Sequence, residues 1–298
     1  MAKRRIVQWL CALLYNANLP GFIQGRIYRG PLKSVCVPGL NCYSCPGAVG
    51  ACPLGSLQSS LSGVILHFPF YVLGLLIIFG VLFGRLICGW ACPFGLVQEL
   101  LYKLPTPKIK FSPALQRFTL LKYVITVLFM VVLPLAYYYA DGIGIPAFCK
   151  FICPAGILEA ALPLAAVKPS IRNALGALFS WKLLLLIIIL ATSTFIYRPF
   201  CRFLCPLGAI YSLFNRLSVY GIKVDMEKCI GCDKCLHHCP MQCHKLGDRE
   251  CINCGACAEV CPTKAITLGK KMSFSLKFSC HIINYLQLLE VHHEKNLD

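Results

Sequence analysis

Long apolar stretches alternate along the chain with short polar segments that are rich in cysteine. A helix needs about 20 apolar residues to cross the hydrocarbon core of a bilayer. The first stretch is interrupted by Asn16, Asn18 and Pro20, and the last contains the unbroken run LLLLIIIL. Four stretches reach or approach the required length, at residues 6–23, 61–83, 119–139 and 178–200. The pattern predicts an α-helical membrane bundle of about four transmembrane helices.

Basic residues flank these stretches and do not form a single stripe. Lysine and arginine collect in cytoplasmic loops, and the bias here favours a cytoplasmic N-terminus and a cytoplasmic region after the fourth span. The group Lys3, Arg4 and Arg5 could also begin a cleaved signal peptide. No small-residue cleavage site follows the apolar stretch, so we expect a retained first helix. The expected protein is multi-pass and lies in the inner (cytoplasmic) membrane.

The composition agrees with contact between the chain and lipid. Hydrophobic residues make up 57% of the 298 residues and charged residues 14%, whereas soluble domains average about 45–50% and about 25%. A net charge of +17 would also suit a nucleic-acid partner. Because the basic residues border apolar segments, they indicate membrane lipid as the partner and argue against nucleic-acid binding.

The 21 cysteines are too numerous for packing alone, and an odd number cannot be closed into disulfides within one chain. Most lie in C-x-x-C or C-x-x-x-C groups, which is the spacing of metal ligands. Cys11 and Cys280 stand apart from these groups and suit packing as small hydrophobic residues. Metal ligation is therefore the main expectation for the others.

Two segments near the C-terminus repeat the C-x2-C-x2-C-x3-C-P pattern of bacterial ferredoxins, in which the fourth cysteine reaches the other cluster. Zinc sites lack this fourth cysteine and proline. Cys243, between the motifs, is predicted to be a spare thiol. Residues 219–225 and 265–268 are predicted strands of a small α+β ferredoxin-like domain. We expect two [4Fe–4S] clusters, one held by Cys229, Cys232, Cys235 and Cys261 and the other by Cys251, Cys254, Cys257 and Cys239.

A second repeat, C-x-x-x-C-P-x-G, occurs three times beside the predicted spans, with a looser copy over residues 42–55. Positions i and i+4 share a helix face, so each pair would present two thiolates together. Two pairs could then hold one cluster, giving one or two further clusters in the membrane domain. Packing of the thiols, or disulfides on the outer side, is the alternative. The predicted topology groups Cys88, Cys92, Cys201 and Cys205 on the cytoplasmic side, and Cys149 and Cys153 with members of the set Cys36, Cys42, Cys45 and Cys52 on the outer side.

The sequence gives no sign of other cofactors. It has no C-x-x-C-H motif for c-type haem, no second histidine beside His67 within the spans for b-type haem, and no glycine-rich nucleotide fingerprint. Glu99 and Glu159 follow C-P-x-G segments and are candidates for proton transfer or for positions at the interface. No other catalytic residue is predicted.

Three parts are expected along the chain. They are a membrane domain at residues 1–218, a tandem [4Fe–4S] ferredoxin-like domain at 219–269, and an unassigned tail at 270–298. The tail is expected to form one short helix at 280–290 or to be disordered.

Membrane C-x3-C-P motifs followed by a tandem cluster domain resemble the NapH-like family, the membrane subunits of quinol dehydrogenases, and the NosR-like polyferredoxins. The resemblance implies four spans, two cytoplasmic clusters and passage of electrons from quinol to a partner. The extra cysteine groups at residues 42–52 and 149–153 depart from the family pattern. The resemblance rests on Cys88, Cys92, Cys201, Cys205 and the eight ferredoxin cysteines.

The expected function is membrane-bound iron–sulfur electron transfer between the quinone pool or a membrane partner and a cytoplasmic redox partner protein. The chain would act as a subunit of a quinol dehydrogenase-type complex. Two alternatives stay open. One is copper reduction, because the chain also resembles the membrane iron–sulfur protein that reduces copper during cytochrome oxidase assembly. The other is a transmembrane thiol–disulfide relay through the outer cysteines.

Overall fold

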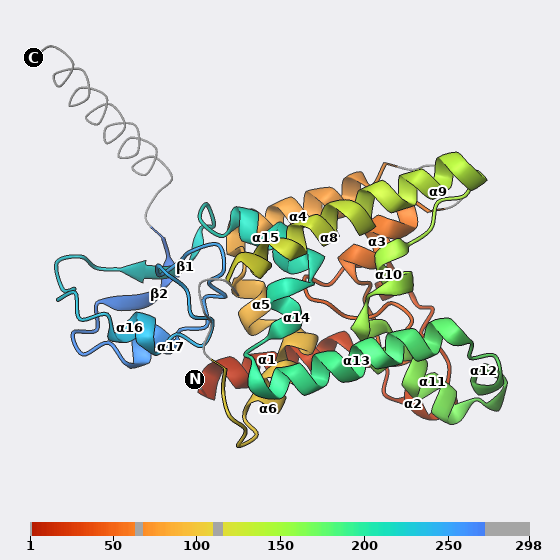
Figure 1. Ribbon diagram of the computed structural model, residues 1–298, viewed down its shortest axis with the longest axis horizontal. Helices are drawn as coiled ribbons and strands as arrows, with labels where there is room; N and C mark the ends of the chain where they lie inside the picture. Colours follow the sequence, from red (N-terminus) through yellow and green to blue (C-terminus); the bar gives the residue numbers. More distant parts are fainter. Residues whose placement is uncertain (1, 63–67, 110–115, 272–298) are drawn as a thin grey trace, which may run out of the picture.

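The computed structural model describes residues 2–62, 68–109 and 116–271. A helical body fills most of this range, and a small region with two strands lies at one end of it (Figure 1). The expected tail helix at 280–290, Cys280 and His67 lie outside the described residues. The structure is therefore mostly helical, with few strands.

The helical body is built from many short helices and a few long ones. Its first half contains α1 (Ala2–Tyr15), α2 (Pro20–Gln24), η1 (Pro31–Ser34), α3 (Pro53–Ser60), α4 (Phe70–Phe83), α5 (Leu86–Trp90) and α6 (Pro93–Tyr102). Its second half contains η2 (Phe118–Leu120), α8 (Leu121–Val127), η3 (Leu128–Val132), α9 (Leu133–Asp141), α10 (Ala147–Phe151), η4 (Gly156–Ala161), α11 (Leu162–Val167), α12 (Pro169–Asn173), α13 (Ala177–Phe195), α14 (Pro199–Phe203) and α15 (Pro206–Phe214).

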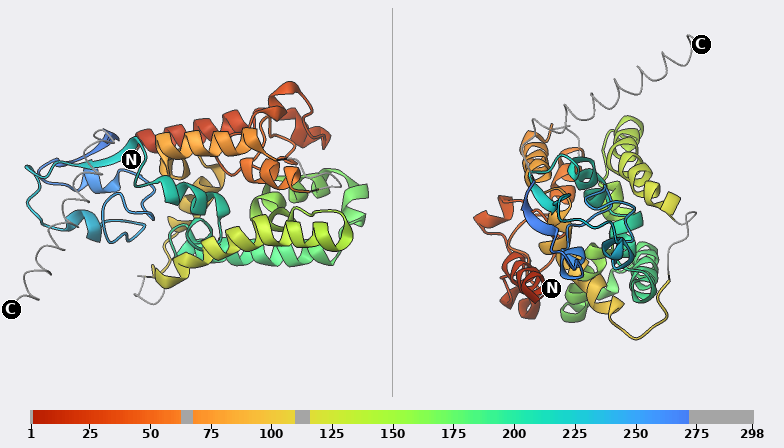
Figure 2. Two further views of the ribbon diagram at one scale, coloured as in Figure 1. Left: turned by 90° about the horizontal axis from the view of Figure 1, so that it is seen from above. Right: turned by 90° about the vertical axis from the view of Figure 1, so that its left-hand side faces the viewer.

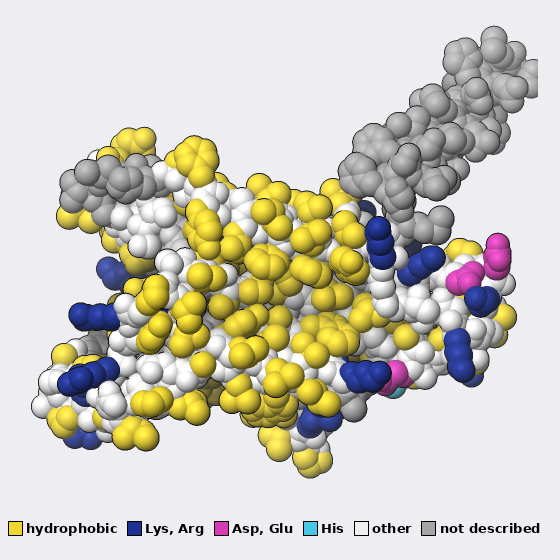
Figure 3. Space-filling view, turned by 180° about the vertical axis from the view of Figure 1, so that it is seen from behind, with side chains coloured by type: hydrophobic (Ala, Val, Ile, Leu, Met, Phe, Trp, Pro, Cys, Tyr) yellow, Lys and Arg dark blue, Asp and Glu magenta, His cyan; other side chains and the backbone are white. Residues whose placement is uncertain are grey.

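Among the residues that the structure describes, two helices are long and apolar enough to cross a bilayer. They are the continuous helix Phe118–Asp141, of 24 residues, and α13, of 19 residues. Only 22% and 17% of the 18-residue apolar stretch in each helix is buried. Most of the hydrophobic side chains therefore face outward, unlike those of the core helix of a soluble protein. Figure 3 shows hydrophobic side chains across the middle of one face, with lysine and arginine toward its two ends.

The other two expected spans are not confirmed as continuous helices of that length within the described residues. The first apolar stretch is divided into α1 and α2, because the chain leaves the helix after Tyr15 and Asn16 turns its amide to the carbonyl of Ala12 (3.0 Å). Of the second stretch, residues 63–67 lie outside the described range, and the described helix, α4, has 14 residues.

Two π-helical turns widen the helices just before a proline. Turn η3 precedes Pro134 and turn η4 precedes Pro163. Proline has no N–H and collides with the carbonyl four residues earlier, so the preceding turn opens to relieve the contact. Turn η4 contains Glu159, one of the two acidic residues singled out from the sequence.

The helical body contains two similar units that pack reciprocally. In each unit a cysteine motif precedes a hydrophobic helix, α4 or α13, and a second motif follows it. Helix α6 of the first unit packs against α13 of the second, and α15 of the second packs against α4 of the first. Because of this exchange, cysteine motifs from the two units meet.

The small C-terminal region carries two antiparallel strands, β1 (Tyr220–Val224) and β2 (Ile266–Lys270), paired from Tyr220 with Lys270 to Val224 with Ile266. They lie where the sequence predicts strands, and the short helices α16 (Lys234–His237) and α17 (Ala256–Glu259) lie between them in the chain. The start of β1 is joined to α4, since Val219 N–H donates to the carbonyl of Val81 (2.9 Å) and the rings of Phe83 and Tyr220 stack.

Candidate metal centres

The C-x-x-x-C-P-x-G repeat has one local structure in its copies. Cys88, Cys149 and Cys201 lie in the five-residue helices α5, α10 and α14. Each of these helices then ends, and Cys92 and Cys205 adopt extended backbone (ψ 115° in both) directly before the next helix. The expectation that each pair occupies one face of a continuous helix is therefore wrong. Proline at the first helical position starts a new helix and cannot continue the old one.

The glycine of the repeat lies beside the second cysteine. The backbone N–H of Gly208 donates to Cys205 Sγ (3.4 Å), so cysteine acts as the helix N-cap. In the other copies Gly55, Gly95 and Gly156 make the same backbone interaction with Cys52, Cys92 and Cys153. A Cβ at Gly95 would lie 2.9 Å from Arg198 Nη1, which explains why a larger residue is absent there.

We call the first group of cysteines site A; it contains Cys88, Cys92, Cys201 and Cys205. All four are buried. The Cys205 sulfur interacts electrostatically with the other three, so one motif from each unit supplies a pair. Gln98, from the first unit, forms hydrogen bonds with two consecutive residues of the second unit, Phe200 and Cys201. Its Oε1 accepts from Phe200 N–H (3.1 Å) and its Nε2 donates to Cys201 Sγ (3.2 Å).

Two arginines tie the halves of site A together. Arg85 Nη2 donates to the carbonyl of Cys201 (3.3 Å), and Arg198 Nη1 donates to the carbonyl of Cys88. Each arginine stands three residues before the first cysteine of its own motif and bonds the first cysteine of the other. Arg198 adopts a left-handed backbone (φ 53°) although it is fully buried. Such strain persists where the surroundings fix it and clusters at functional sites.

A buried carboxylate neutralises Arg198. Glu99 Oε1 accepts from Arg198 Nε (2.9 Å), and its Oε2 accepts from Arg4 Nη2 (2.8 Å). Tyr197 OH donates to the same carboxylate (2.5 Å). Burial by itself would raise the pKa of Glu99, but Arg198 and Arg4 outweigh it and hold the pKa below its usual value. Glu99 is therefore an ionised partner in a structural network, and its suggested proton role gains no support from this geometry.

Site B is the matching group farther from the strands; it contains Cys42, Cys52, Cys149 and Cys153. The Cys153 sulfur interacts electrostatically with the other three. Here the bracing is reciprocal: Gln58 Oε1 accepts from Cys149 N–H (3.0 Å), and Glu159 Oε2 accepts from Cys42 N–H (2.6 Å). Lys182 Nζ donates to the carbonyl of Cys149 (3.0 Å).

The remaining two cysteines of the first loop are distinguished from site B by their hydrogen bonds, although Cys45 also interacts electrostatically with Cys42. Cys45 Sγ hydrogen-bonds Asn16 Oδ1 (3.5 Å), and Cys36 Sγ hydrogen-bonds Ser56 Oγ (3.4 Å). Sites A and B are separate from each other. The helices α5 and α14 of site A lie near the strands, and α3 and α10 of site B lie toward the opposite end of the body (Figure 1).

Site C lies in the C-terminal region and contains Cys239, Cys251, Cys254 and Cys257. The Cys257 sulfur interacts electrostatically with the other three. Cys243, the predicted spare thiol, is buried and hydrogen-bonds both Cys239 and Cys251. These bonds lower the pKa of Cys239 to about 6 and that of Cys251 to about 7. Both sulfurs are therefore readily available as thiolates, the form that binds metals.

Site D, the group Cys229, Cys232, Cys235 and Cys261 predicted from the sequence, is the most accessible. Cys229 and Cys232 are exposed. Cys235 interacts with Cys232, and Cys261 Sγ hydrogen-bonds Thr263 (3.7 Å). This group lies at the surface of the molecule, where a soluble protein could approach it.

The residues of sites A and B suit a multi-iron cluster better than a single ion. Within the described ranges, no three histidine, cysteine or acidic side chains converge on one metal-ion position. A [4Fe–4S] cluster instead binds four cysteines at four different irons. Backbone N–H groups already point at the sulfurs, and Asn41, fully buried beside Cys42, has a side-chain N–H group without a partner. A cluster sulfur is an acceptor that such a donor requires.

Site C docks directly on site A. A Cβ at Gly89 would lie 2.3 Å from the carbonyl of Ile252, so two backbones touch there. Trp90 Nε1 donates to the carbonyl of Asn253 (3.0 Å). Glu250 lies between two fully buried cations, Arg85 (2.7 Å) and Lys122 (2.5 Å).

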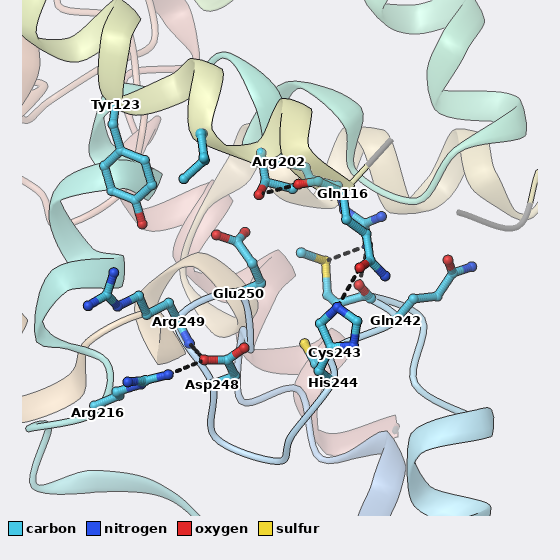
Figure 4. Close-up of a pocket in the computed structure, with 13 residues that line it drawn as sticks. Gln116, Tyr123, Arg202, Arg216, Gln242, Cys243, His244, Asp248, Arg249 and Glu250 are labelled. Atoms are coloured by element: carbon cyan, nitrogen blue, oxygen red, sulfur yellow. Dashed lines mark hydrogen bonds and ion pairs between the residues drawn. The ribbon is translucent and has the colours of Figure 1, made fainter. Parts of the chain in front are cut away.

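A cavity of about 290 Å³ opens at this junction. It is bordered by the start of the long helix, including Thr119 and Tyr123, and by the loop before site C, including Cys243 and His244. Figure 4 shows His244 and Gln116 hydrogen-bonded across it, with Glu250 and Asp248 on its far wall. Polar groups therefore line a hollow at the end of a helix that could cross a bilayer.

Sequence reasoning missed the bracing role of these residues, including that of Glu159, which it had singled out only for proton transfer or a position at the interface. The signals were present: Arg85 and Arg198 both stand three residues before a cysteine, and Gln58, Gln98 and Glu159 all stand six residues after one. A single sequence does not show which polar residues in a repeat point inward, so their role emerges only with the packing of the two units.

Family models and related proteins agree with an iron–sulfur assignment. A model described as a 4Fe-4S binding domain matches residues 64–112, 123–162 and 179–224, and another with the same description matches residues 248–267. The first three segments contain the repeats at Cys88, Cys149 and Cys201, and the fourth contains the second ferredoxin motif. No solved structure matches the chain significantly.

Four relatives illustrate the range of similarity. An uncharacterized protein of Methanocaldococcus jannaschii is 33% identical over 174 residues, covering 56% of this chain and 63% of that protein, and a second protein of this organism is matched over 55% of its length. The methylamine utilization ferredoxin-type protein MauN of Methylobacillus flagellatus is 29% identical over 248 residues (80% and 75%). The ferredoxin-type protein NapH of Haemophilus influenzae is 28% identical over 167 residues (56% and 51%).

The chain thus covers less than two thirds of the first relatives that it matches. The regulatory protein NosR of Stutzerimonas stutzeri matches as well. The cysteine repeats, the matched 4Fe-4S models and these relatives agree on one assignment. The chain is a ferredoxin-type [4Fe–4S] protein that is similar to the NapH-like and NosR-like proteins.

Proposed function

We propose that the chain is a membrane-bound electron-transfer protein that connects a quinone pool or membrane partner with a cytoplasmic redox protein. The single observation that supports this most is the row of cysteine groups: site D at the surface, site C against site A, and site B deeper in the helical body. A [4Fe–4S] cluster held at each site would accept and release one electron at a time.

In this proposal the chain is divided as the sequence suggests. Residues 1–218 form a membrane domain with about four spans, residues 219–269 form a tandem ferredoxin-like domain in the cytoplasm, and residues 270–298 have no assigned role. The outward-facing apolar side chains of Phe118–Asp141 and α13 support contact with lipid. The inner membrane, with sites C and D in the cytoplasm, follows from the distribution of basic residues.

The residues of sites A and B would hold the two membrane clusters. Arg85, Arg198 and Lys182 fix the backbone of the first cysteines, and Gln58 and Gln98 hold opposite motifs in register. All of these bonds except the one from Lys182 join the two units, so the chain itself sets the distance between the cysteine pairs.

Iron content tests the number of clusters. Four clusters require about sixteen irons per chain, and we expect Cys88→Ala and Cys149→Ala each to lose about four. Cys11→Ala is the matched control, because Cys11 lies in α1 outside any motif, and it should keep them all. About eight irons in the unaltered protein would refute membrane ligation. Redox-active disulfides at Cys149 or Cys153 would support the thiol relay instead.

The cavity between the long helix and site C is our candidate for the binding site of the quinone headgroup. A quinone ring carries two carbonyl oxygens, and His244 and Tyr123 bring N–H or O–H groups to opposite walls of the cavity. The ring would lie beside Cys243, which contacts two cysteines of site C. The cavity is lined by the first turns of a lipid-facing helix, along which a membrane-soluble substrate would arrive.

Reduction by quinol tests this assignment. We expect His244→Leu and Tyr123→Phe to slow cluster reduction by quinol but not by dithionite. Tyr137→Phe, farther along the same long helix and outside the cavity, is the control. Clusters that stay oxidised with quinol and are reduced only by a low-potential ferredoxin would refute quinol oxidation. Copper(II) reduction that needs no quinol would favour copper handling.

A further inference from the structure

Residues 38–42, which we call the bridging segment, lie between sites A and B. The backbone N–H of Leu40 hydrogen-bonds the sulfur of Cys92, a member of site A. The N–H of the next residue, Asn41, hydrogen-bonds the sulfur of Cys52, a member of site B. Leu40 and Asn41 are almost completely buried. Two adjacent peptide units, joined at the Leu40 Cα, therefore carry the donors to the two sites.

Close packing holds the bridging segment against site A. A Cβ at Gly39 would lie 3.1 Å from the carbonyl of Ala91 and 3.2 Å from Cys92 Cα, so only glycine lets the two backbones approach this closely without strain. At its other end the segment enters site B, where Cys42 N–H donates to Glu159 Oε2 (2.6 Å). Both ends are thus fixed to their sites.

Tyr211 fixes the first residue of the bridging segment, Pro38. It stands six residues after Cys205, the position that Gln58, Gln98 and Glu159 occupy in the other copies. Those three residues brace an opposing motif, whereas Tyr211 OH donates to the carbonyl of Pro38 (3.0 Å). Its side chain is fully buried and interacts electrostatically with thiols of both sites, among them Cys88, Cys92 and Cys52.

We propose that the bridging segment is the electronic connection between sites A and B, and that Tyr211 is the residue that positions it. Electronic coupling between two redox groups is stronger along a path of bonded atoms than along a path of equal length that crosses van der Waals gaps. One electron leaves the group at one site and reduces the group at the other; no covalent bond is made or broken and no proton moves. The inference rests on the proposed function, since it requires clusters at both sites.

The test uses the full chain, purified without oxygen in detergent with all its iron. Leu40→Pro deletes the N–H that bonds Cys92. Tyr211→Phe keeps the buried ring and removes only the bond to Pro38, so it is the variant expected to keep the fold. Tyr102→Phe is the control; its ring packs edge-on against Tyr197, and this contact needs no hydroxyl. Three quantities are measured. They are the iron content, the reduction potential of each cluster by electron paramagnetic resonance, and the rate at which electrons redistribute between sites A and B after a reducing flash. Freeze-quenching at successive times gives this rate.

We expect Tyr211→Phe to retain its iron and both membrane signals, to leave the potential of site B unchanged, and to slow redistribution between the sites severalfold. Leu40→Pro should also lower the potential of site A, because a hydrogen bond to a cysteine sulfur raises it. Redistribution at the unaltered rate in an iron-complete Tyr211→Phe protein would overturn the bridge alone. About eight irons in the unaltered protein would overturn the membrane clusters, and the bridge with them.

Discussion

Replacing Glu99 with glutamine removes the only carboxylate that the described residues place between Arg4 and Arg198. The change keeps the size of the side chain and deletes its charge. Arg198 is fully buried and Arg4 is 5% exposed, so both cations would be left without compensation. Breaking a buried ion pair by removing one partner costs about 3–5 kcal/mol, and the retained amide oxygen argues for the lower end, about 3 kcal/mol. For a chain of this size each kcal/mol lowers the melting temperature by about 2–4 °C, so we expect a loss of about 6–12 °C.

The same network of Glu99, Arg4 and Arg198 predicts how the stability of the protein depends on pH. The pKa of Glu99 in the folded protein lies below its usual value, because Arg198 and Arg4 outweigh the effect of burial. The stabilisation is therefore complete above the unfolded pKa of about 4.3 and is lost as the pH falls through the lower folded value. The difference between the unaltered protein and Glu99→Gln should be constant from pH 8 to about pH 5 and should shrink only in stronger acid.

Thermal unfolding in detergent, followed by tryptophan fluorescence, measures this difference. Glu227→Gln is the matched control, because Glu227 is exposed beside β1 and should unfold with the unaltered protein. A Glu99→Gln protein that melts within a degree of Glu227→Gln would refute the reasoning, since it would mean that solvent or a neighbour already compensates both arginines.

Two further substitutions test the docking of site C and the bracing of site A. Gly89→Val would place a Cβ 2.3 Å from the Ile252 carbonyl; because both partners are backbone, we expect faster amide exchange over residues 251–254 by mass spectrometry. Gly74→Val, with nothing within 4 Å of a Cβ, should leave that exchange unchanged. Gln98→Leu removes the donor to Cys201 Sγ (3.2 Å) and the acceptor for Phe200 N–H. It should lower the potential of site A in a redox titration and leave sites C and D unaffected; a potential that does not move would show that this bond does not tune the site.

The sequence alone indicated much of the arrangement of the cysteines. The period of the C-x-x-x-C-P-x-G repeat and its position beside apolar stretches suggested that Cys88 and Cys92 meet Cys201 and Cys205, which the structure brings together. Selecting Cys42 and Cys52 from the first loop required the structure. There Cys36 and Cys45 turn to Ser56 and Asn16, and no spacing rule distinguishes the four.

The helix geometry was harder to predict because proline changes it locally. The spacing of Cys88 and Cys92 fits one helix face, yet Pro93 starts a new helix and leaves Cys92 in extended backbone. The first apolar stretch likewise breaks where Asn16 finds partners in Ala12 and Asn41. Hydropathy alone does not show where either helix ends. At Asn16 the end is set by contacts made in tertiary packing, and at Pro93 it is set by the absence of a proline N–H.

The order of the cysteine pairs along the chain has a consequence for how the molecule is made. The pairs alternate, with site B first, then site A, then B and A again, so each unit carries half of each site. Neither half of the chain can complete a site, and the reciprocal packing of α6 on α13 and α15 on α4 is that of two subunits about a twofold axis. The helical body is thus organised like a homodimer joined into one chain, and its symmetry is broken at Tyr211, which stands where the other motif copies carry Gln58, Gln98 and Glu159.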